Sequence, residues 1–407
     1  MDTELNKSRL FTKDYISIIL VVLLISIVMN MTMATLPIYG KQIGGSNVLA
    51  GFITATFTLS ALFFRPLFGN LLDRKGRKKI LLIGIFIFAL SVLSYIFAYT
   101  IIILLFFRFM QGIGFSGHST GSGTIVADIV PTDRMGEGIG YFGIANIIGS
   151  AIGPTIGLYI INYFHYQYLF IFSGILSVSA LLIAFIINYE KNKEKEFIDY
   201  PNKNTEDLIE DTELTDKISL DKQSFIEKTA LPSSIILIFI ALTYGSIITF
   251  ISIYARNKGI ENIGIFFVCY AVALLLTRVN MGKIIDKYGI NNVMIPGLIL
   301  LFLSLILLAF AESLITFLIT AFLYGFGYGV VFPTLNTVMV KVCPPSRRGA
   351  GNATFFSAMD IGVGFGSVLW GFISDVFGFA YVYITASLSI ILALILYLYF
   401  YKGKKIS

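Results

Sequence analysis

The chain has 407 residues, of which 56% are apolar and only 13% are charged. A soluble domain usually carries about 25% charged residues, so this composition excludes an ordinary soluble fold. The net charge of +6 could suggest nucleic-acid binding, but the placement of the charges indicates membrane topology instead. The two cysteines, Cys269 and Cys343, show no metal-ligand spacing, and we expect no disulfide framework.

Long apolar runs separated by short polar segments follow one another along the chain. A helix of about 20 residues crosses the hydrocarbon core of a bilayer, whereas a β-barrel would alternate in segments of about ten residues. The pattern predicts an all-α polytopic membrane protein with twelve transmembrane helices. The predicted spans are 15–39, 48–72, 80–99, 101–128, 137–163, 168–189, 231–254, 263–285, 291–311, 313–341, 350–377 and 380–401.

Lysine and arginine residues indicate the orientation in the membrane, because cytoplasmic loops carry an excess of them. With the N-terminus inside, 24 of the 30 basic residues lie in the inner loops and termini. The outer loops then hold only Lys41, Arg256 and Lys258. The sequence therefore predicts a multi-pass protein of the cell membrane with both termini and the central loop in the cytoplasm.

One long polar segment, residues 190–230, separates six predicted spans in residues 1–189 from six in residues 231–407. It mixes acidic residues with lysines and is too polar to bury a core. We interpret it as a cytoplasmic central loop that tethers two six-helix bundles. A regulatory binding site is the alternative.

The two halves repeat one pattern. Residues 69–79 read GNLLDRKGRKK, and Gly282, Asp286 and Gly289 repeat the Gly, Asp and Gly positions 213 residues later. A repeat at a fixed offset indicates a duplicated architecture. The same offset pairs Gly51 with Gly264, Arg65 with Arg278, Gly112 with Gly325, Arg134 with Arg347 and Gly149 with Gly362.

Three motifs occur in order along the first half: Gly69-x-x-x-Asp73-Arg74-x-Gly76-Arg77-Lys78, Leu104-x-x-x-Arg108-x-x-Gln111-Gly112-x-Gly114 and Gly149-x-x-x-Gly153-Pro154-x-x-Gly157. Together they resemble the major facilitator superfamily. The fifth-span motif is similar to that of the twelve-span drug:proton antiporters of this family. The resemblance implies two pseudo-symmetric six-helix bundles with a substrate site near the midplane and alternating access.

The first motif and its repeat predict a latch at the cytoplasmic edge. Glycine permits close backbone approach and positive φ, and an aspartate can accept hydrogen bonds at the N-terminus of a neighbouring helix. Arg77 can pair with Asp128, which ends the fourth span. By the resemblance, such contacts would hold the bundles in an outward-facing state. The alternative, which applies to the lysines of this segment, is that its basic residues only fix the membrane topology. The predicted latch residues are Gly69, Asp73, Gly76, Arg77, Asp128 and Asp286.

The fifth span carries Gly149, Gly153 and Gly157 at intervals of four, on one helix face. Small faces let helices pack closely in a membrane, and Pro154 removes a backbone donor. This face is interpreted as a gating surface, with simple packing as the alternative.

Charged residues inside the membrane are costly and usually functional. Asp360 is the acid that lies well inside a predicted span, and burial disfavours its carboxylate. We predict that it carries a proton, paired with Arg108 or Arg278; a static pair is the alternative. His118, in a polar stretch of the fourth span, could titrate near neutral pH or bind substrate.

Polar and aromatic residues near the centre of four spans are candidates for substrate contact. By analogy with the family, the first, fourth, seventh and tenth spans line the cavity. The candidates are Asn30, Gln111, Phe115, Tyr244, Tyr324, Tyr328 and Asn336.

Together these features predict a secondary active transporter that exports small amphipathic organic molecules in exchange for protons. A dedicated exporter of a polar metabolite, such as a sugar or a metallophore, is the alternative. We expect a monomer in the lipid bilayer, powered by the proton gradient, with no enzymatic activity, cofactor, metal site or nucleic-acid partner.

Overall fold

The computed structural model describes residues 10–189, 226–344 and 347–401, without the side chains of residues 73–74, 132 and 279–288. Within these residues the chain forms twelve long α-helices. Most of the predicted central loop, 190–230, lies outside the described residues. The helices are α1 (Lys13–Gln42), α2 (Asn47–Lys75), α3 (Arg77–Ser94), α4 (Ile101–Ile129), α5 (Met135–Tyr163), α6 (Tyr166–Ile186), α9 (Leu231–Asn257), α10 (Gly264–Tyr288), α11 (Ile290–Ala309), α12 (Leu314–Val342), α13 (Arg348–Phe377) and α14 (Phe379–Tyr401).

Among the described residues, eleven helices are long and apolar enough to cross a bilayer. In α10 the described apolar part is Gly264–Arg278, and the helix continues to Tyr288. Large apolar side chains point outward, with Phe63 74% and Ile102 76% exposed. Such an exposed apolar surface is suited to lipid and not to water. The predicted all-α, multi-pass membrane fold is confirmed.

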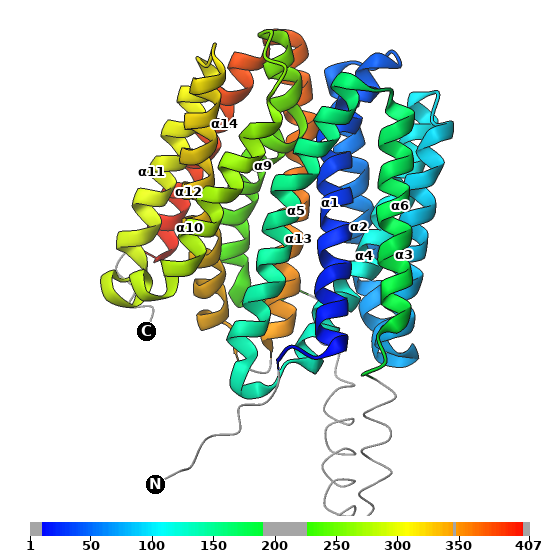
Figure 1. Cartoon of the computed structure of the whole chain (residues 1–407). Helices are drawn as coiled ribbons and strands as arrows, with labels where there is room; N and C mark the ends of the chain where they lie inside the picture. The colour runs from blue at the N-terminus through cyan, green and yellow to red at the C-terminus, as the bar shows by residue number, and fades with distance from the viewer. Residues whose placement is uncertain (1–9, 190–225, 345–346, 402–407) are drawn as a thin grey trace, which may run out of the picture.

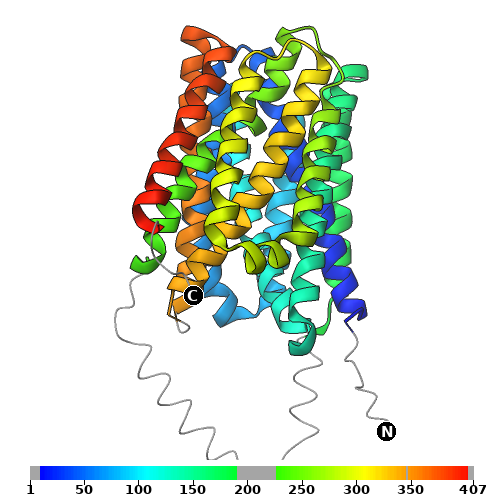
Figure 2. The same cartoon turned by 90° about the vertical axis from the view of Figure 1, so that its left-hand side faces the viewer.

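The helices pack as two bundles, α1–α6 and α9–α14, which lie side by side (Figures 1 and 2). The start of α1 and the end of α14 lie at the same end of the molecule, which we call the terminal face (Figure 1). The other end is called the opposite face.

The duplication in the sequence is also a duplication of local structure. Gly76, before α3, has a φ of 91°, and Gly289, before α11, has a φ of 79°. Glycine adopts this left-handed region without strain. Thr100 caps the N-terminus of α4 and Ser313 caps α12, each through its side-chain oxygen. Both pairs are 213 residues apart, so equivalent helices begin in equivalent ways.

The glycines of α5 let it approach α1 within the first bundle. A methyl group added at Gly153 would collide with the carbonyl oxygen of Ile27, and one at Gly149 would collide with Ser26. The counterparts in α13 pack against α9 in the same way. Close packing within a bundle is thus what this face provides, and a gating role stays a prediction. Gly157 of α5 packs against α1 as well, and the counterparts that pack against α9 are Gly362 and Gly366 of α13.

The two bundles contact each other closely at the opposite face. Asp375, near the end of α13, accepts hydrogen bonds from the backbone N–H groups of Asn47 (3.2 Å) and Val48 (3.1 Å) at the start of α2. Between α5 and the turn before α10, Asn162 Nδ2 donates to the carbonyl oxygen of Glu261 (2.9 Å). These bonds close the opposite face between the bundles.

The terminal ends of the same helices are less closely packed. A methyl group added at Gly69 in α2 or at Gly349 in α13 would have no neighbouring atom within 4 Å. These two positions at the terminal face are open, whereas hydrogen bonds join the bundles at the opposite face.

Glycine packing in α5 gives a matched test of the fold. We expect Gly153→Ala to lower the unfolding temperature, because the added methyl meets backbone and overpacking costs about 1–3 kcal/mol. Gly140→Ala, on the same helix but in open space, should keep or raise it, since alanine favours helix by about 1 kcal/mol over glycine. Thermal unfolding of both variants in detergent checks this, and equal shifts would contradict the packing described.

Candidate substrate and coupling site

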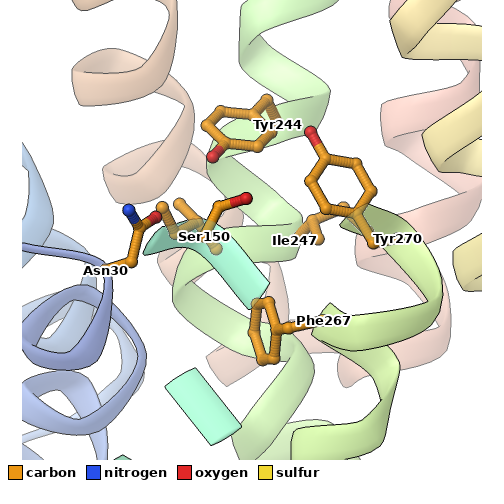
Figure 3. Close-up of a pocket in the computed structure, with 7 residues that line it drawn as sticks. Asn30, Ser150, Tyr244, Ile247, Phe267 and Tyr270 are labelled. Carbon is orange, nitrogen blue, oxygen red and sulfur yellow. The ribbon is translucent and has the colours of Figure 1, made fainter. Parts of the chain in front are cut away.

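A small cavity lies between the bundles near the middle of the helices (Figure 3). Asn30 of α1 and Ser150 of α5 border it from one bundle. Tyr244 of α9 and Tyr270 of α10 border it from the other. Its wall combines aromatic surface with a few polar groups, as small-molecule sites do. The remaining lining residues are Ile247, Ile248 and Phe267.

The residues predicted for substrate contact are only partly assembled at this cavity. Asn30 and Tyr244 line it, whereas Ser150, Phe267 and Tyr270 were missed. They lie on α5 and α10, the fifth and eighth helices of the twelve, which the family analogy did not include. The other predicted residues do not line this cavity: Gln111, Phe115, Tyr324, Tyr328 and Asn336.

Four tyrosines of the second bundle form one cluster beside the cavity, here called the tyrosine cluster: Tyr244, Tyr270, Tyr324 and Tyr328. Tyr244 stacks on Tyr328 with ring centroids 5.3 Å apart, and Tyr324 stacks on Tyr328 at 6.2 Å. Tyr324 shares a hydrogen bond of 2.9 Å with Thr243. Within the described residues, the buried Tyr328 hydroxyl has no hydrogen-bond partner. Two of the four tyrosines, Tyr244 and Tyr270, line the cavity, and Tyr328 adds an unsatisfied donor beside them.

A second buried polar atom in this bundle, Asn336 Oδ1, likewise has no partner among the described residues. Buried polar groups are usually satisfied, and exceptions often mark functional sites.

Arg108 is fully buried within the first bundle. Its guanidinium donates hydrogen bonds to residues of the same bundle. Nε donates to the Ile53 carbonyl oxygen (3.1 Å), and Nη1 donates to Gln111 Oε1 (2.7 Å). The guanidinium also lies 4.9 Å from the centre of the Phe57 ring. Gln111 accepts a further hydrogen bond from Tyr95 (2.5 Å). Arg108 and Gln111 thus belong to an internal network of α4 and its neighbours.

Asp360 pairs with an arginine that the sequence analysis did not select. Arg65 Nη2 of α2 lies 3.2 Å from Asp360 Oδ2 of α13, so the ion pair joins the two bundles. The predicted partners, Arg108 and Arg278, are wrong. The helical pattern gave the depth of each charge but not the direction in which its helix faces, and α13 presents Asp360 to α2 and not to α4 or α10.

The Asp360 carboxylate is incompletely satisfied. Oδ2 forms no hydrogen bond to the described residues, so the ion pair with Arg65 is what compensates its charge there. By the helical rise of 1.5 Å per residue, Asp360 lies roughly 18 Å along α13 from the terminal end of the helix. At this depth a charge that loses its partner costs several kcal/mol.

His118 is buried in α4, and its Nδ1 has no hydrogen-bond partner among the described residues. Its ring lies 6.2 Å from that of Phe115, which in turn packs on Phe57 at 5.3 Å. The predicted roles of His118 and Phe115 therefore stay predictions, since neither residue borders the described cavity.

The predicted latch is present in part. Arg77 at the start of α3 forms an ion pair with Asp128 at the end of α4, as the sequence analysis expected. Both helices belong to the first bundle, so this pair does not itself join the bundles. The side chains of Asp73 and Asp286 lie outside the described residues. The latch function stays a prediction.

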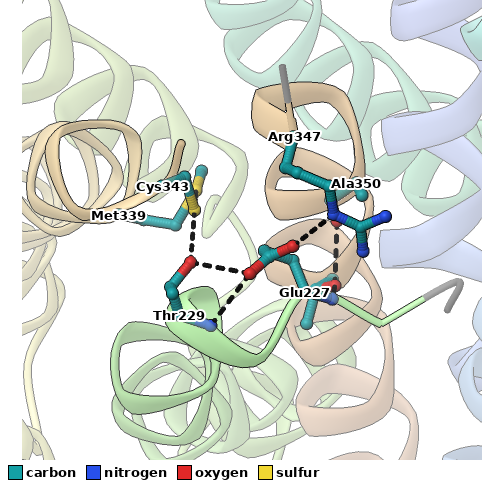
Figure 4. Close-up of polar contacts among 7 residues, drawn as sticks. Glu227, Thr229, Met339, Cys343, Arg347 and Ala350 are labelled. Atoms are coloured by element: carbon teal, nitrogen blue, oxygen red, sulfur yellow. Dashed lines mark hydrogen bonds and ion pairs between the residues drawn. The ribbon is translucent and has the colours of Figure 1, made fainter. Parts of the chain in front are cut away.

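A polar cluster at the terminal face ties the start of α9 to α12 and α13 (Figure 4). Arg347 Nε donates to Glu227 Oε2 (2.6 Å), and the Thr229 hydroxyl donates to Glu227 Oε1 (2.9 Å). These hydrogen bonds, that of Arg347 first, lower the pKa of Glu227 to about 2. Thr229 also contacts the Cys343 thiol (3.4 Å). The cluster therefore stays charged at neutral pH and links helices of the second bundle at the terminal face.

Comparison with known proteins decides the family. The model of the Major Facilitator Superfamily matches residues 18–261 and, as a second match, residues 233–406. The chain belongs to the major facilitator superfamily. The first match covers the first bundle and continues through α9, and the second match covers the second bundle. The resemblance stated from the motifs is confirmed.

Relatives in this superfamily include exporters. The staphylopine export protein of Staphylococcus aureus is 26% identical over 354 residues, covering 85% of this chain and 85% of that protein. A homologue of the multi-drug resistance efflux pump PmrA from Lactococcus lactis is 26% identical over 362 residues, again covering 85% of each chain. The chain is therefore similar to drug-efflux-type transporters of small molecules.

A solved structure shows the same fold. The inward-open xylose transporter XylE from E. coli superposes with a TM-score of 0.74 at 17% identity, covering 96% of this chain and 97% of that chain. At this identity the likeness concerns the fold alone.

The Glu227 cluster gives a prediction about pH. Because the pKa of Glu227 is lower in the folded protein, its carboxylate stabilises the fold at pH values above 4.5, its pKa in the unfolded chain. This contribution is lost as the pH falls toward about 2. Between about pH 5 and about pH 8, Glu227→Gln should lower the unfolding temperature by a constant amount. Thermal unfolding at several pH values checks this. A difference that disappears on acidification to about pH 5 would contradict the assignment.

Proposed function

We propose that the protein is a proton-coupled exporter of small amphipathic organic molecules that works by alternating access. The observation that carries this proposal is the Arg65–Asp360 ion pair, which joins the two bundles inside the membrane-spanning region. It lies where a proton could change how the bundles interact.

The proposed coupling follows from the chemistry of this pair. Protonation of Asp360 removes its negative charge and weakens the attraction that holds α13 to Arg65 of α2. Moving the bundles apart with both charges intact would expose two unpaired ions, which is strongly unfavourable. A proton on Asp360 therefore lowers the cost of separating the helices, and its release restores the pair.

The conformation supports alternating access with a defined orientation. If the terminal face is cytoplasmic, as the distribution of basic residues favours, the bundles are hydrogen-bonded to each other at the outer end. This is the arrangement in which an exporter loads its substrate. The protein then works as a monomer in the cell membrane, because one chain supplies both bundles.

The cavity supports an amphipathic substrate. The tyrosine rings and Phe267 provide apolar surface, while Asn30 and Ser150 provide hydrogen-bonding groups. Apolar rings beside a few polar groups suit an amphipathic molecule, in keeping with the efflux pumps to which the chain is similar.

Export of one polar metabolite is the second candidate. It is favoured by the unsatisfied buried atoms of Tyr328 and Asn336, and by similarity to a protein named for staphylopine export. A dedicated site would satisfy these atoms with its substrate.

Proton coupling is tested in inverted vesicles with a pH-sensitive dye. In wild-type vesicles, adding a transported probe from a panel of ethidium, dansylglycine and dansyl glycinamide should dissipate the pH gradient. Asp360→Asn should abolish this proton movement, because the side chain can no longer exchange a proton.

Glu312→Gln is the matched control, since the Glu312 side chain is 80% exposed and distant from the cavity. It should behave as wild type. Undiminished proton movement in Asp360→Asn would exclude this residue as the carrier, and wild-type vesicles silent to every probe would contradict proton-coupled export.

A further inference from the structure

Arg278 is a second charged residue between the bundles, on the other side of the cavity from Arg65. It lies in α10, roughly 15 Å from the terminal end of that helix by the helical rise. Its guanidinium points toward α5, because a methyl group added at Gly143 would collide with Arg278 Nη1. The absence of a side chain at Gly143 thus makes room for the guanidinium at the contact between α5 and α10.

Arg278 forms no ion pair or hydrogen bond within the described part of the chain. Its counterpart in the repeat, Arg65, is paired with Asp360. The position equivalent to Asp360 in α5 is Ile147, a buried apolar residue. The second copy of this arrangement has therefore kept its cation and lacks its anion. The Arg278 side chain is exposed, so an anion from outside the protein can reach its guanidinium and compensate its charge.

The surroundings of Arg278 extend to the cavity. Arg278 lies near Tyr270 and Tyr328 in the same bundle. Tyr270 lines the cavity, and the Tyr328 hydroxyl has no hydrogen-bond partner among the described residues. A fork of guanidinium donors beside a free hydroxyl donor suits a planar anion that accepts two or more hydrogen bonds. The adjacent tyrosine faces suit an aromatic or apolar group.

We propose that Arg278, with Tyr328, binds the carboxylate of an organic acid whose apolar part packs against Tyr270 and Tyr244. The inference rests on the proposed export function and names its substrate class: amphipathic molecules with a carboxylate. A cationic group at the same place is disfavoured, because Arg278 would repel it. The site also explains why α5 carries glycine and isoleucine where α13 carries phenylalanine and aspartate at the equivalent positions, 356 and 360.

The test compares two fluorescent probes that differ only in charge. Dansylglycine carries a carboxylate, and dansyl glycinamide is its neutral amide. Binding of each probe to the purified full-length protein is measured by fluorescence titration in nanodiscs of phosphatidylcholine, a lipid with no net charge. Wild type should bind dansylglycine at least about tenfold more tightly, equivalent to about 1.4 kcal/mol.

Variants separate a binding role from a structural one. Arg278→Gln should weaken dansylglycine binding about tenfold and change dansyl glycinamide binding less than about twofold, while Arg278→Lys should retain part of the preference. Ile147→Asp should abolish the preference with Arg278 still present, because it supplies the missing anion. Ile147→Asn, of the same size without the charge, should keep it.

Equal affinity of wild type for the two probes would overturn the assignment. So would equal loss of both probes in Arg278→Gln, or identical behaviour of the two Ile147 variants. Because binding needs no proton gradient, the result is independent of the export test. Selective binding without proton movement would overturn coupled export alone, and export of ethidium without selective dansylglycine binding would overturn the carboxylate site alone.

Discussion

The carboxylate of Asp360 and the guanidinium of Arg65 form an ion pair between the two bundles. At this depth in the membrane, an unpaired charge is unfavourable. Arg65 and Asp360 come from different halves of the chain, and each reaches the other across the contact of α2 with α13. Separating the pair within the membrane is unfavourable while both groups are ionised. Separation costs less once Asp360 is protonated, so the contact between α2 and α13 depends on the charge of Asp360. The arrangement of the two bundles is thereby linked to one titratable group, and the proposed coupling depends on that link.

The two contacts between the bundles differ in a way that the duplication makes visible. On the α2–α13 side the charges are balanced by the protein. On the α5–α10 side Arg278 forms no ion pair with a described acid, and Gly143 makes room for its guanidinium. With the cavity between them, one side is suited to a proton and the other to a substrate anion. An exporter that exchanges a proton for a substrate anion could then use one duplicated charge pattern to bind both. The hydrogen bonds at the opposite face would form the closed gate.

The sequence was sufficient to predict the fold, because apolar runs of membrane length, the fixed offset and the family motifs all depend on local pattern. It also placed Asp360 inside the membrane and paired Arg77 with Asp128, whose positions follow from helix ends. It failed where the direction of a helix matters. Arg108 was a plausible partner for Asp360 by depth, yet its guanidinium is held by the Ile53 carbonyl oxygen and Gln111 within its own bundle. Tyr270 was missed for the same reason, since spacing alone did not show that α10 borders the cavity.

The central claim is that the charge on Asp360 holds the bundles in the arrangement described here. It is tested most directly by measuring spin-label distances between the terminal ends of α2 and α13, with labels at Gly69 and Gly349, where the structure leaves open space. The account predicts that Asp360→Asn, and acidification of wild type, shift the distance distribution in the same direction, and that acidification has no further effect on the variant. Distances in Asp360→Asn that match wild type at neutral pH, with an unchanged response to acid, would contradict it.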